Sequence, residues 1–306
     1  MKYVLLFAGQ GAQVPGMGRD LCEKYAEARQ VFETADKVLG RSLSQVCFEG
    51  TEAALTDTSN CQPGIFVHSL AALAVLKAHR PSLELAACAG LSLGEFSAHT
   101  AAGTFSFDEG LKIVQQRGTF MQEACAATHG SMAALIGADE VQAVEIAREA
   151  DVDVANYNSP GQIILSGAAE NIARAVEIAK TKGIKKAIPL TVAGAYHSRL
   201  MKSAQDKLAA ALAPVEVRIP TVPVVSNFTA QRAATPGEIR NDLISQVTGS
   251  VRWEQSMRLL LSLGHTHFIE LGPGNVLSGL MWRIDKAAVV HTVSDVATLE
   301  TTLAAL

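Results

Sequence analysis

A strand-to-helix turn built around one serine constrains this chain more than any other feature. The apolar stretch LELAACAG (83–90) runs into the pentapeptide GLSLG (90–94), and helix-compatible sequence follows. Glycines two residues before and after a serine are typical of a sharp turn with the serine at its tip. The N-terminus of a following helix adds N–H donors where an oxyanion forms. Ser92 is therefore a candidate nucleophile, although small-residue turns of this kind also occur without any chemistry.

Alternation of strand-like and helix-like segments predicts an α/β fold around this turn. The run YVLLFAG (3–9) has the character of a first strand, and a helical pattern covers residues 18–39. Strands that lead into helices in this way indicate a core with a mainly parallel sheet. The run 64–76 is predicted as a buried helix and not as a membrane span, because no apolar run reaches the roughly 18 residues that a span needs.

The middle of the chain follows a different order, which predicts a small inserted unit. Its segments read as strand, helix, strand, strand, helix and strand, over residues 131–137, 138–150, 152–158, 162–167, 168–183 and 185–192. This β-α-β-β-α-β order is the ferredoxin-like arrangement. We therefore expect a core made of residues 1–127 and 195–306, with a subdomain at 128–194. A cleft between two such units is a common place for a substrate site.

Composition excludes some functions and favours one compartment. The net charge of −4 argues against general nucleic-acid binding. The five cysteines are an odd number without a CxxC pair, which favours reduced thiols in a cytoplasm over disulfides or a zinc site. Neither a metal site nor an organic cofactor is implied, and no membrane partner is expected.

A nucleophilic serine needs a base, which is usually a histidine. Of the eight histidines, His197 in GAYHSRLM (194–201) follows a strand and a glycine-containing turn where the chain leaves the inserted unit. It is therefore expected to overlook the cleft. Packing, surface or structural roles are expected for His68, His79, His99, His265, His267 and His291. Many acidic residues lie between the serine and this histidine, and none stands out as the third member of a triad.

Six motifs in order along the chain resemble those of the malonyl-CoA:acyl-carrier-protein transacylase family. They are FAGQGAQVPGMG (7–18), GLSLGEFSAH (90–99), QQRGTFMQEA (115–124), NYNSPGQIILSG (156–167), GAYHSRLM (194–201) and IELGPGNVLSGL (269–280). The resemblance extends over essentially the whole chain. It implies an α/β-hydrolase-like core with an inserted ferredoxin-like subdomain.

The resemblance also implies a mechanism with a covalent intermediate. Ser92 is expected to attack the thioester carbonyl of malonyl-CoA while His197 takes its proton and then protonates the departing thiolate. The phosphopantetheine thiol of an acyl carrier protein then takes the malonyl group, which gives ping-pong kinetics and supplies fatty-acid synthesis.

The resemblance assigns supporting roles to residues around this pair. Backbone N–H groups of Gln10 and Leu93 are expected to form the oxyanion hole, with Gly9 and Gly11 allowing close approach of their loop. The main-chain carbonyl of Gln246 takes the place of the missing acid by orienting the histidine.

Substrate choice is assigned by the resemblance to Arg117, whose guanidinium fork suits the malonyl carboxylate. From local sequence alone, this arginine would be an exposed helical residue. Tyr196 stands where the family usually has phenylalanine when malonyl is selected, so malonyl remains the expected group. Two positions depart from the family: Leu91 replaces the usual histidine, and Arg199 replaces a small residue or proline. Arg199 is expected either to meet substrate or to form a surface salt bridge.

Carrier proteins are acidic, so a basic docking surface is expected. The candidates are Lys182, Lys185 and Lys186 of the inserted unit, together with Arg199; the alternative for the lysines is a solvated helix end. The protein is expected to be a monomer.

Three classes of alternative function are considered from sequence. A serine thioesterase or other hydrolase uses a similar turn. A trans-acting polyketide-synthase acyltransferase, or the malonyl-transfer subunit of a malonate decarboxylase, shares the chemistry in another context. A non-catalytic scaffold is disfavoured because serine, histidine and arginine occur together.

Overall fold

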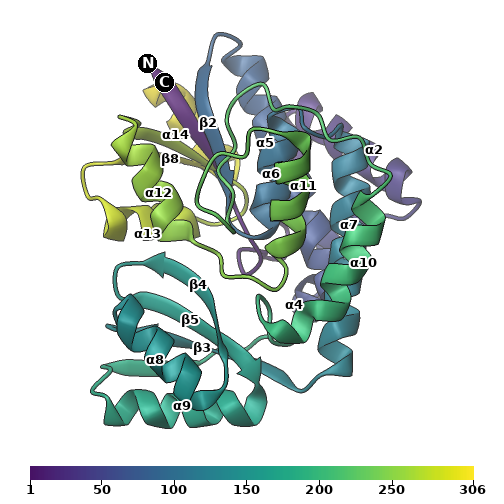
Figure 1. The fold of residues 1–306 in the computed structure, drawn as a ribbon. Helices are drawn as coiled ribbons and strands as arrows, with labels where there is room; N and C mark the ends of the chain where they lie inside the picture. Colours follow the sequence, from purple (N-terminus) through teal and green to yellow (C-terminus); the bar gives the residue numbers. More distant parts are fainter.

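Two four-stranded sheets organise the chain, and Figure 1 shows them in separate units, one above the other. The structure is a computed structural model that describes residues 1–306. The first sheet has the strand order β2-β1-β7-β8, and every neighbouring pair is parallel. Its strands are β1 (Lys2–Phe7), β2 (Glu84–Gly90), β7 (His267–Leu271) and β8 (Val289–Val293). The predicted parallel sheet of the core is confirmed.

Helices surround this parallel sheet, which explains why β1 is buried over five of its six residues. In chain order they are α1 (Arg19–Lys24), α2 (Ala26–Leu39), α3 (Leu43–Glu49), α4 (Glu52–Thr56), α5 (Thr58–His79), α6 (Leu93–Ala101), α7 (Phe107–Ala127), the 3₁₀ turn η1 (Arg199–Met201), α10 (Lys202–Leu212), α11 (Pro236–Ser245), α12 (Trp253–Ser262), α13 (Val276–Ile284) and α14 (Val296–Ala305).

Two of these helices bear on the sequence predictions. The single helix expected over residues 18–39 is divided at Tyr25, whose extended backbone (φ −119°, ψ 125°) separates α1 from α2. Helix α5 contains the run 64–76 and is the one helix long and apolar enough to cross a membrane, yet 83% of its most apolar window is buried inside the protein. It packs against α2 and α7.

The second sheet is antiparallel and lies in the lower, teal unit of Figure 1. Its strand order is β4-β5-β3-β6, and α8 and α9 pack against it. The elements are β3 (Gly130–Ile136), α8 (Glu140–Ala150), β4 (Asp153–Ser159), β5 (Gln162–Ala168), α9 (Ala169–Thr181) and β6 (Lys186–Pro189). The expected β-α-β-β-α-β order is confirmed, whereas the limits of the domains as folding units stay a prediction.

The two faces of the antiparallel sheet serve different cores. Ala133 and Leu135 of β3 belong to a cluster of 16 buried residues shared with α8 and α9. Met132 and Ala134, which alternate with them along β3, belong to the 54-residue cluster of the larger unit. Because successive side chains of a strand point to opposite faces, one face closes the small core and the other faces the larger unit.

Candidate active site

The serine turn joins β2 to α6 and holds Ser92 in an uncommon backbone conformation. Ser92 has φ 54° and ψ −104°. A Cβ at Gly90 would lie 2.0 Å from the backbone of Gly94, and a Cβ at Gly94 would lie 2.1 Å from the carbonyl oxygen of Phe7. Both glycines are therefore required by close backbone packing, which holds the serine in its strained turn.

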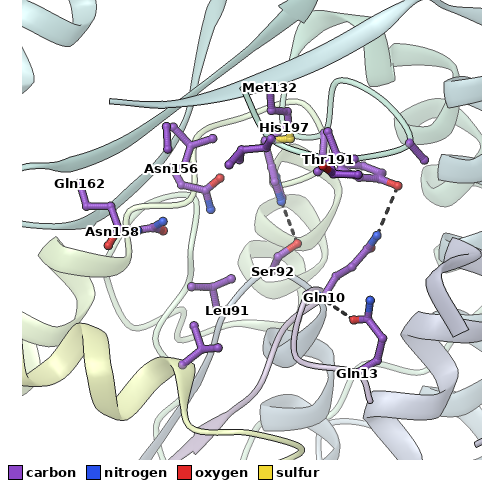
Figure 2. A pocket seen from close by; sticks show the side chains of 18 of the residues that line it. Gln10, Gln13, Leu91, Ser92, Met132, Asn156, Asn158, Gln162, Thr191 and His197 are labelled. Atoms are coloured by element: carbon purple, nitrogen blue, oxygen red, sulfur yellow. Dashed lines mark hydrogen bonds between the residues drawn. The ribbon is translucent and has the colours of Figure 1, made fainter. Parts of the chain in front are cut away.

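His197 lies directly against the serine, as Figure 2 shows. The Oγ of Ser92 is 2.7 Å from Nε2 of His197, and Nδ1 of His197 is 2.8 Å from the main-chain oxygen of Gln246. Since a carbonyl oxygen only accepts hydrogen bonds, Nδ1 carries the proton and Nε2 is free to accept from the serine hydroxyl. Burial, and secondly the charge of Arg117, lower the pKa of His197 to about 4. The imidazole is therefore a neutral base at pH 7.

Arg117 of α7 is buried beside the same hydroxyl, and not exposed as its local sequence alone predicts. Its Nη2 donates to Oγ of Ser92 at 3.0 Å and to Oε1 of Gln246 at 2.9 Å. Its Nη1 donates to Oε1 of Gln62 at 2.7 Å. All three acceptors are neutral, and no carboxylate forms a salt bridge with the guanidinium. Burial lowers the pKa of Arg117 to about 10, which leaves it protonated at pH 7.

The acid nearest to this cation in the hydrogen-bond network is Glu95, which is fully buried in α6. Its Oε2 accepts from Nε2 of Gln246 at 2.6 Å and from the backbone N–H of Asn227 at 3.1 Å. Burial raises the pKa of Glu95 to about 8, against the opposing effect of these hydrogen bonds. Because the carboxyl is mostly protonated at pH 7, it does not neutralise Arg117. The site therefore holds a buried positive charge without a matching anion.

Asn227 is a site residue that sequence reasoning missed. Its Oδ1 accepts from the backbone N–H of Ser92 at 2.6 Å, and its Nδ2 donates to the carbonyl of Gly90 at 2.7 Å. One side chain thus ties both sides of the strained turn together. The contact joins residues 135 positions apart, so no local pattern marks it; the same holds for Gln62 beside Arg117.

Two backbone N–H groups near the serine have no fixed protein acceptor. The N–H of Gln10 donates to no protein atom, and that of Leu93 stands at the first position of α6, where helices leave N–H groups unpaired. A Cβ at Gly9 would lie 2.4 Å from the carbonyl oxygen of Leu91, and Gly11 has φ 100°. The glycines therefore let the Gln10 loop approach the serine turn closely.

A cavity of about 360 Å³ opens in front of the serine. The core contributes Gln10 and Leu91 to its wall, and the inserted unit contributes Met132, Asn156 and Gln162 (Figure 2). The predicted cleft between the two units is thus present at the reactive pair. Its size and mixed polar and apolar lining are typical of small-molecule sites.

Tyr196 also lines this cavity and is anchored by its hydroxyl. That oxygen lies 2.8 Å from Oγ1 of Thr58 and accepts from Nε2 of Gln10 at 3.3 Å. Burial raises the pKa of the phenol to about 12, so it stays neutral. The hydroxyl, which a phenylalanine would lack, therefore ties Tyr196 to the Gln10 loop.

The cations predicted to dock a partner lie outside the cavity, and two of them are engaged by acids. Arg199 forms ion pairs with Asp151 and Asp153, each at 2.8 Å. Lys182 lies 3.2 Å from a carboxylate oxygen of Glu149. Of the two roles considered for Arg199, the surface salt bridge is the one observed. No group of three or more His, Cys, Asp or Glu side chains is placed to hold a metal ion.

Comparisons with known proteins identify the family of this chain. The acyl transferase domain family matches residues 4–296. The malonyl CoA-acyl carrier protein transacylase of Bacillus subtilis (strain 168) is 41% identical over 304 residues, which cover 98% of this chain and 95% of the relative. The structure of acyl-carrier-protein-S-malonyltransferase from Bartonella henselae superposes with a TM-score of 0.94 at 38% identity, covering 100% and 99% of the two chains. The structure of a malonyl-transacylase in complex with its type II PKS acyl-carrier protein superposes with a TM-score of 0.95 at 34% sequence identity, covering 100% of both chains.

Proposed function

Because the chain belongs to the acyl transferase domain family, among the malonyl CoA-acyl carrier protein transacylases, we propose that it moves malonyl from malonyl-CoA to an acyl carrier protein. The acceptor is the thiol of the carrier's phosphopantetheine, and the intermediate is a malonyl ester of Ser92. The observation that carries the proposal is the buried, unmatched charge of Arg117 at 3.0 Å from the serine oxygen.

In the first half-reaction, Oγ of Ser92 attacks the thioester carbonyl carbon as its proton passes to Nε2 of His197. The 2.7 Å contact supports this transfer, and the carbonyl of Gln246 stabilises the imidazolium through Nδ1. The N–H groups of Gln10 and Leu93 donate to the oxyanion. The carbon–sulfur bond then breaks, and the CoA thiolate leaves with the proton from His197.

The second half-reaction repeats these steps with another thiol. The phosphopantetheine sulfur attacks the malonyl ester while its proton passes to His197. The ester bond breaks, the proton returns to Oγ of Ser92, and the carrier leaves as its malonyl thioester. No further cofactor is needed, because malonyl-CoA and the loaded carrier are the substrates.

Arg117 selects malonyl by binding its carboxylate. A guanidinium pairs well with a carboxylate through two parallel hydrogen bonds, and the acceptors it now contacts are only neutral groups. An acetyl group brings no anion to this buried cation, so acetyl-CoA is expected to be a poor donor. Leu91 lines the cavity in place of the histidine usual in the family, which makes the wall beside the serine more apolar.

The family supports a proposal for the carrier and the pathway. We propose that the enzyme acts in the cytoplasm as a monomer, without nucleic-acid or membrane partners, and supplies fatty-acid synthesis. Of the predicted docking cations, Lys182 and Arg199 are occupied by acids, so Lys185 and Lys186 remain as the free positive charges of that set. Similarity to the type II PKS complex favours service to a polyketide carrier as a second candidate.

The proposal is tested by the mass of the intact protein after brief incubation with malonyl-CoA or acetyl-CoA. A malonyl adduct is expected on the wild type and not on Ser92→Ala, and it should pass to added holo carrier protein. Arg117→Ala should lose malonyl labelling selectively. Rapid loss of the adduct to water without a carrier would instead indicate a hydrolase, and equal acetyl and malonyl labelling would contradict the role of Arg117.

A further inference from the structure

Helix α13 and the turn that follows it carry exposed apolar and basic side chains. Val276 and Trp282 are 50% and 60% exposed, and Arg283 and Lys286 are exposed beside them. We call Val276, Trp282, Arg283 and Lys286 the α13 surface. A tryptophan so exposed is unusual for a surface that faces only water, because tryptophan and arginine are enriched at the centres of protein interfaces.

The cations of the α13 surface are free of acidic partners. Neither Arg283 nor Lys286 forms a salt bridge, and Nζ of Lys286 lies 5.0 Å from the ring centroid of Trp282. In contrast, Lys182 and Arg199 of the previously predicted surface are held by aspartate or glutamate. An acidic partner can therefore pair with the α13 cations without first breaking an internal ion pair.

The α13 surface is also continuous with the reactive cavity. Val276 belongs both to this surface and to the cavity wall, and Leu280, on the next turn, lines the cavity as well. Leu277 and Met281 fix the opposite side of the helix in the core. A partner seated on this helix therefore sits at the rim of the cavity that Ser92 also lines.

We propose that the α13 surface docks the acidic carrier protein that delivers the phosphopantetheine thiol. The inference rests on the proposed function and adds the surface to it. Trp282 and Val276 supply the apolar contact, and Arg283 and Lys286 pair with carboxylates of the carrier. Lys186 lies on β6, at the edge of the antiparallel sheet away from β4, and within that sheet α13 packs against β4. The two basic surfaces are therefore separate and can be tested separately.

The test is the double variant Arg283→Glu/Lys286→Glu, assayed in three reactions. These are loading of Ser92 from malonyl-CoA, transfer to free pantetheine, and transfer to the holo acyl carrier protein of Bacillus subtilis. We expect kcat/KM for the carrier to fall about 30-fold or more, because two attractive charges become repulsive. Loading and transfer to pantetheine should stay within about twofold of wild type, since neither uses the docked protein surface. Trp282→Ala should lower the same carrier kcat/KM by about tenfold.

Matched controls change the same net charge elsewhere. Lys37→Glu/Lys112→Glu alters two exposed lysines of α2 and α7, and Lys185→Glu/Lys186→Glu alters the other candidate surface. Carrier transfer by the α13 double variant within twofold of wild type would overturn the docking proposal, as would an equal loss in the Lys37/Lys112 control. A wild type that fails to load malonyl would instead overturn the proposed function, and the docking proposal with it.

Discussion

The buried charge of the reactive site and the exposed ion pairs that join η1 to the inserted unit are arranged in opposite ways. Arg117 is 1% exposed and contacts only neutral acceptors, whereas Arg199 has a side chain 59% exposed and contacts two aspartates. Burying a charge without a partner costs several kcal/mol, while an exposed pair contributes about 0–1 kcal/mol. The unmatched buried charge of Arg117 is therefore the one that supports a role in binding an anionic substrate, whereas the matched charge of Arg199 is an ordinary surface contact.

The sharpest test of the reactive site is removal of its two reacting groups. Ser92→Ala or His197→Ala should lower kcat for malonyl transfer by about 10,000-fold, because each removes a partner of the proton transfer. The measurement is steady-state transfer to a carrier, with the intact mass of each variant after exposure to malonyl-CoA. A malonyl adduct on Ser92→Ala would place the nucleophile elsewhere.

Replacing Arg117 should affect kcat/KM for malonyl-CoA and for acetyl-CoA to different extents. Arg117→Ala is expected to lower kcat/KM for malonyl-CoA by about 100-fold, because a buried charge-assisted pair with the carboxylate is lost. Loading from acetyl-CoA should fall much less, since acetyl does not use the guanidinium and loses only the contact of Nη2 with the serine oxygen. Arg117→Lys is the matched control: it keeps the charge without the fork and should give an intermediate loss. Equal losses for both donors would mean that the arginine supports only the fold.

Substitution of Asn227 tests whether loading depends on the two hydrogen bonds that this side chain makes with the strained turn. Asn227→Ala should lower kcat for loading by about tenfold, because the N–H of Ser92 and the carbonyl of Gly90 lose their buried partner. Asn227→Asp retains the acceptor for Ser92 and should lose less. If kcat were unchanged while the melting temperature fell, Asn227 would hold the fold and not the nucleophile.

The pH profile tests the buried imidazole and carboxyl together. The kcat/KM for malonyl loading should stay flat from pH 7 to about pH 5 and be halved near pH 4, because only the neutral form of His197 accepts the serine proton. Above about pH 8, Glu95 loses its proton and opposes the malonyl carboxylate, so kcat/KM should decline. Glu95→Gln should remove that alkaline decline. An acid limb centred near pH 6.5, the ordinary value for histidine, would contradict the burial argument.

The smallest effect on stability and activity is expected for substitution of Arg199, whose charge is paired with two aspartates. Arg199→Ala should change the free energy of unfolding by about 0–1 kcal/mol, because its partners are aspartates at the surface. Malonyl loading should be unchanged within about twofold. Urea denaturation and the loading assay measure the two quantities. A large loss of loading would show that Arg199 reaches the substrate after all.

Local sequence predicted the elements better than the contacts between them. The glycines around Ser92 and the order of the inserted unit follow from short-range rules on turns and periodicity, and the structure has both. The break at Tyr25 was missed because α1 and α2 continue one helical pattern across it. The side-chain tie from Asn227 was missed because a contact across 135 residues depends on the completed fold.

Local sequence also fails to predict that the charged side chain of Arg117 is buried. The residues next to Arg117 in the sequence predict an exposed position on a helix. Only the resemblance to a family assigns this arginine to the substrate. What buries it is the packing of α7 against α5, together with amide oxygens from distant segments. No periodicity in residues 115–124 encodes those partners.

Ser92 and His197 are two of only four non-glycine residues with positive φ, at 54° and 55°. Glycine occupies this region without strain, whereas a side chain there costs about 1–2 kcal/mol. Replacement by glycine at either position would therefore relieve backbone strain and remove a side chain that the proposed mechanism needs. If the proposed mechanism holds, stability and activity select in opposite directions at these two residues. A search for more stable variants would then discard the proposed nucleophile and base unless activity were selected at the same time.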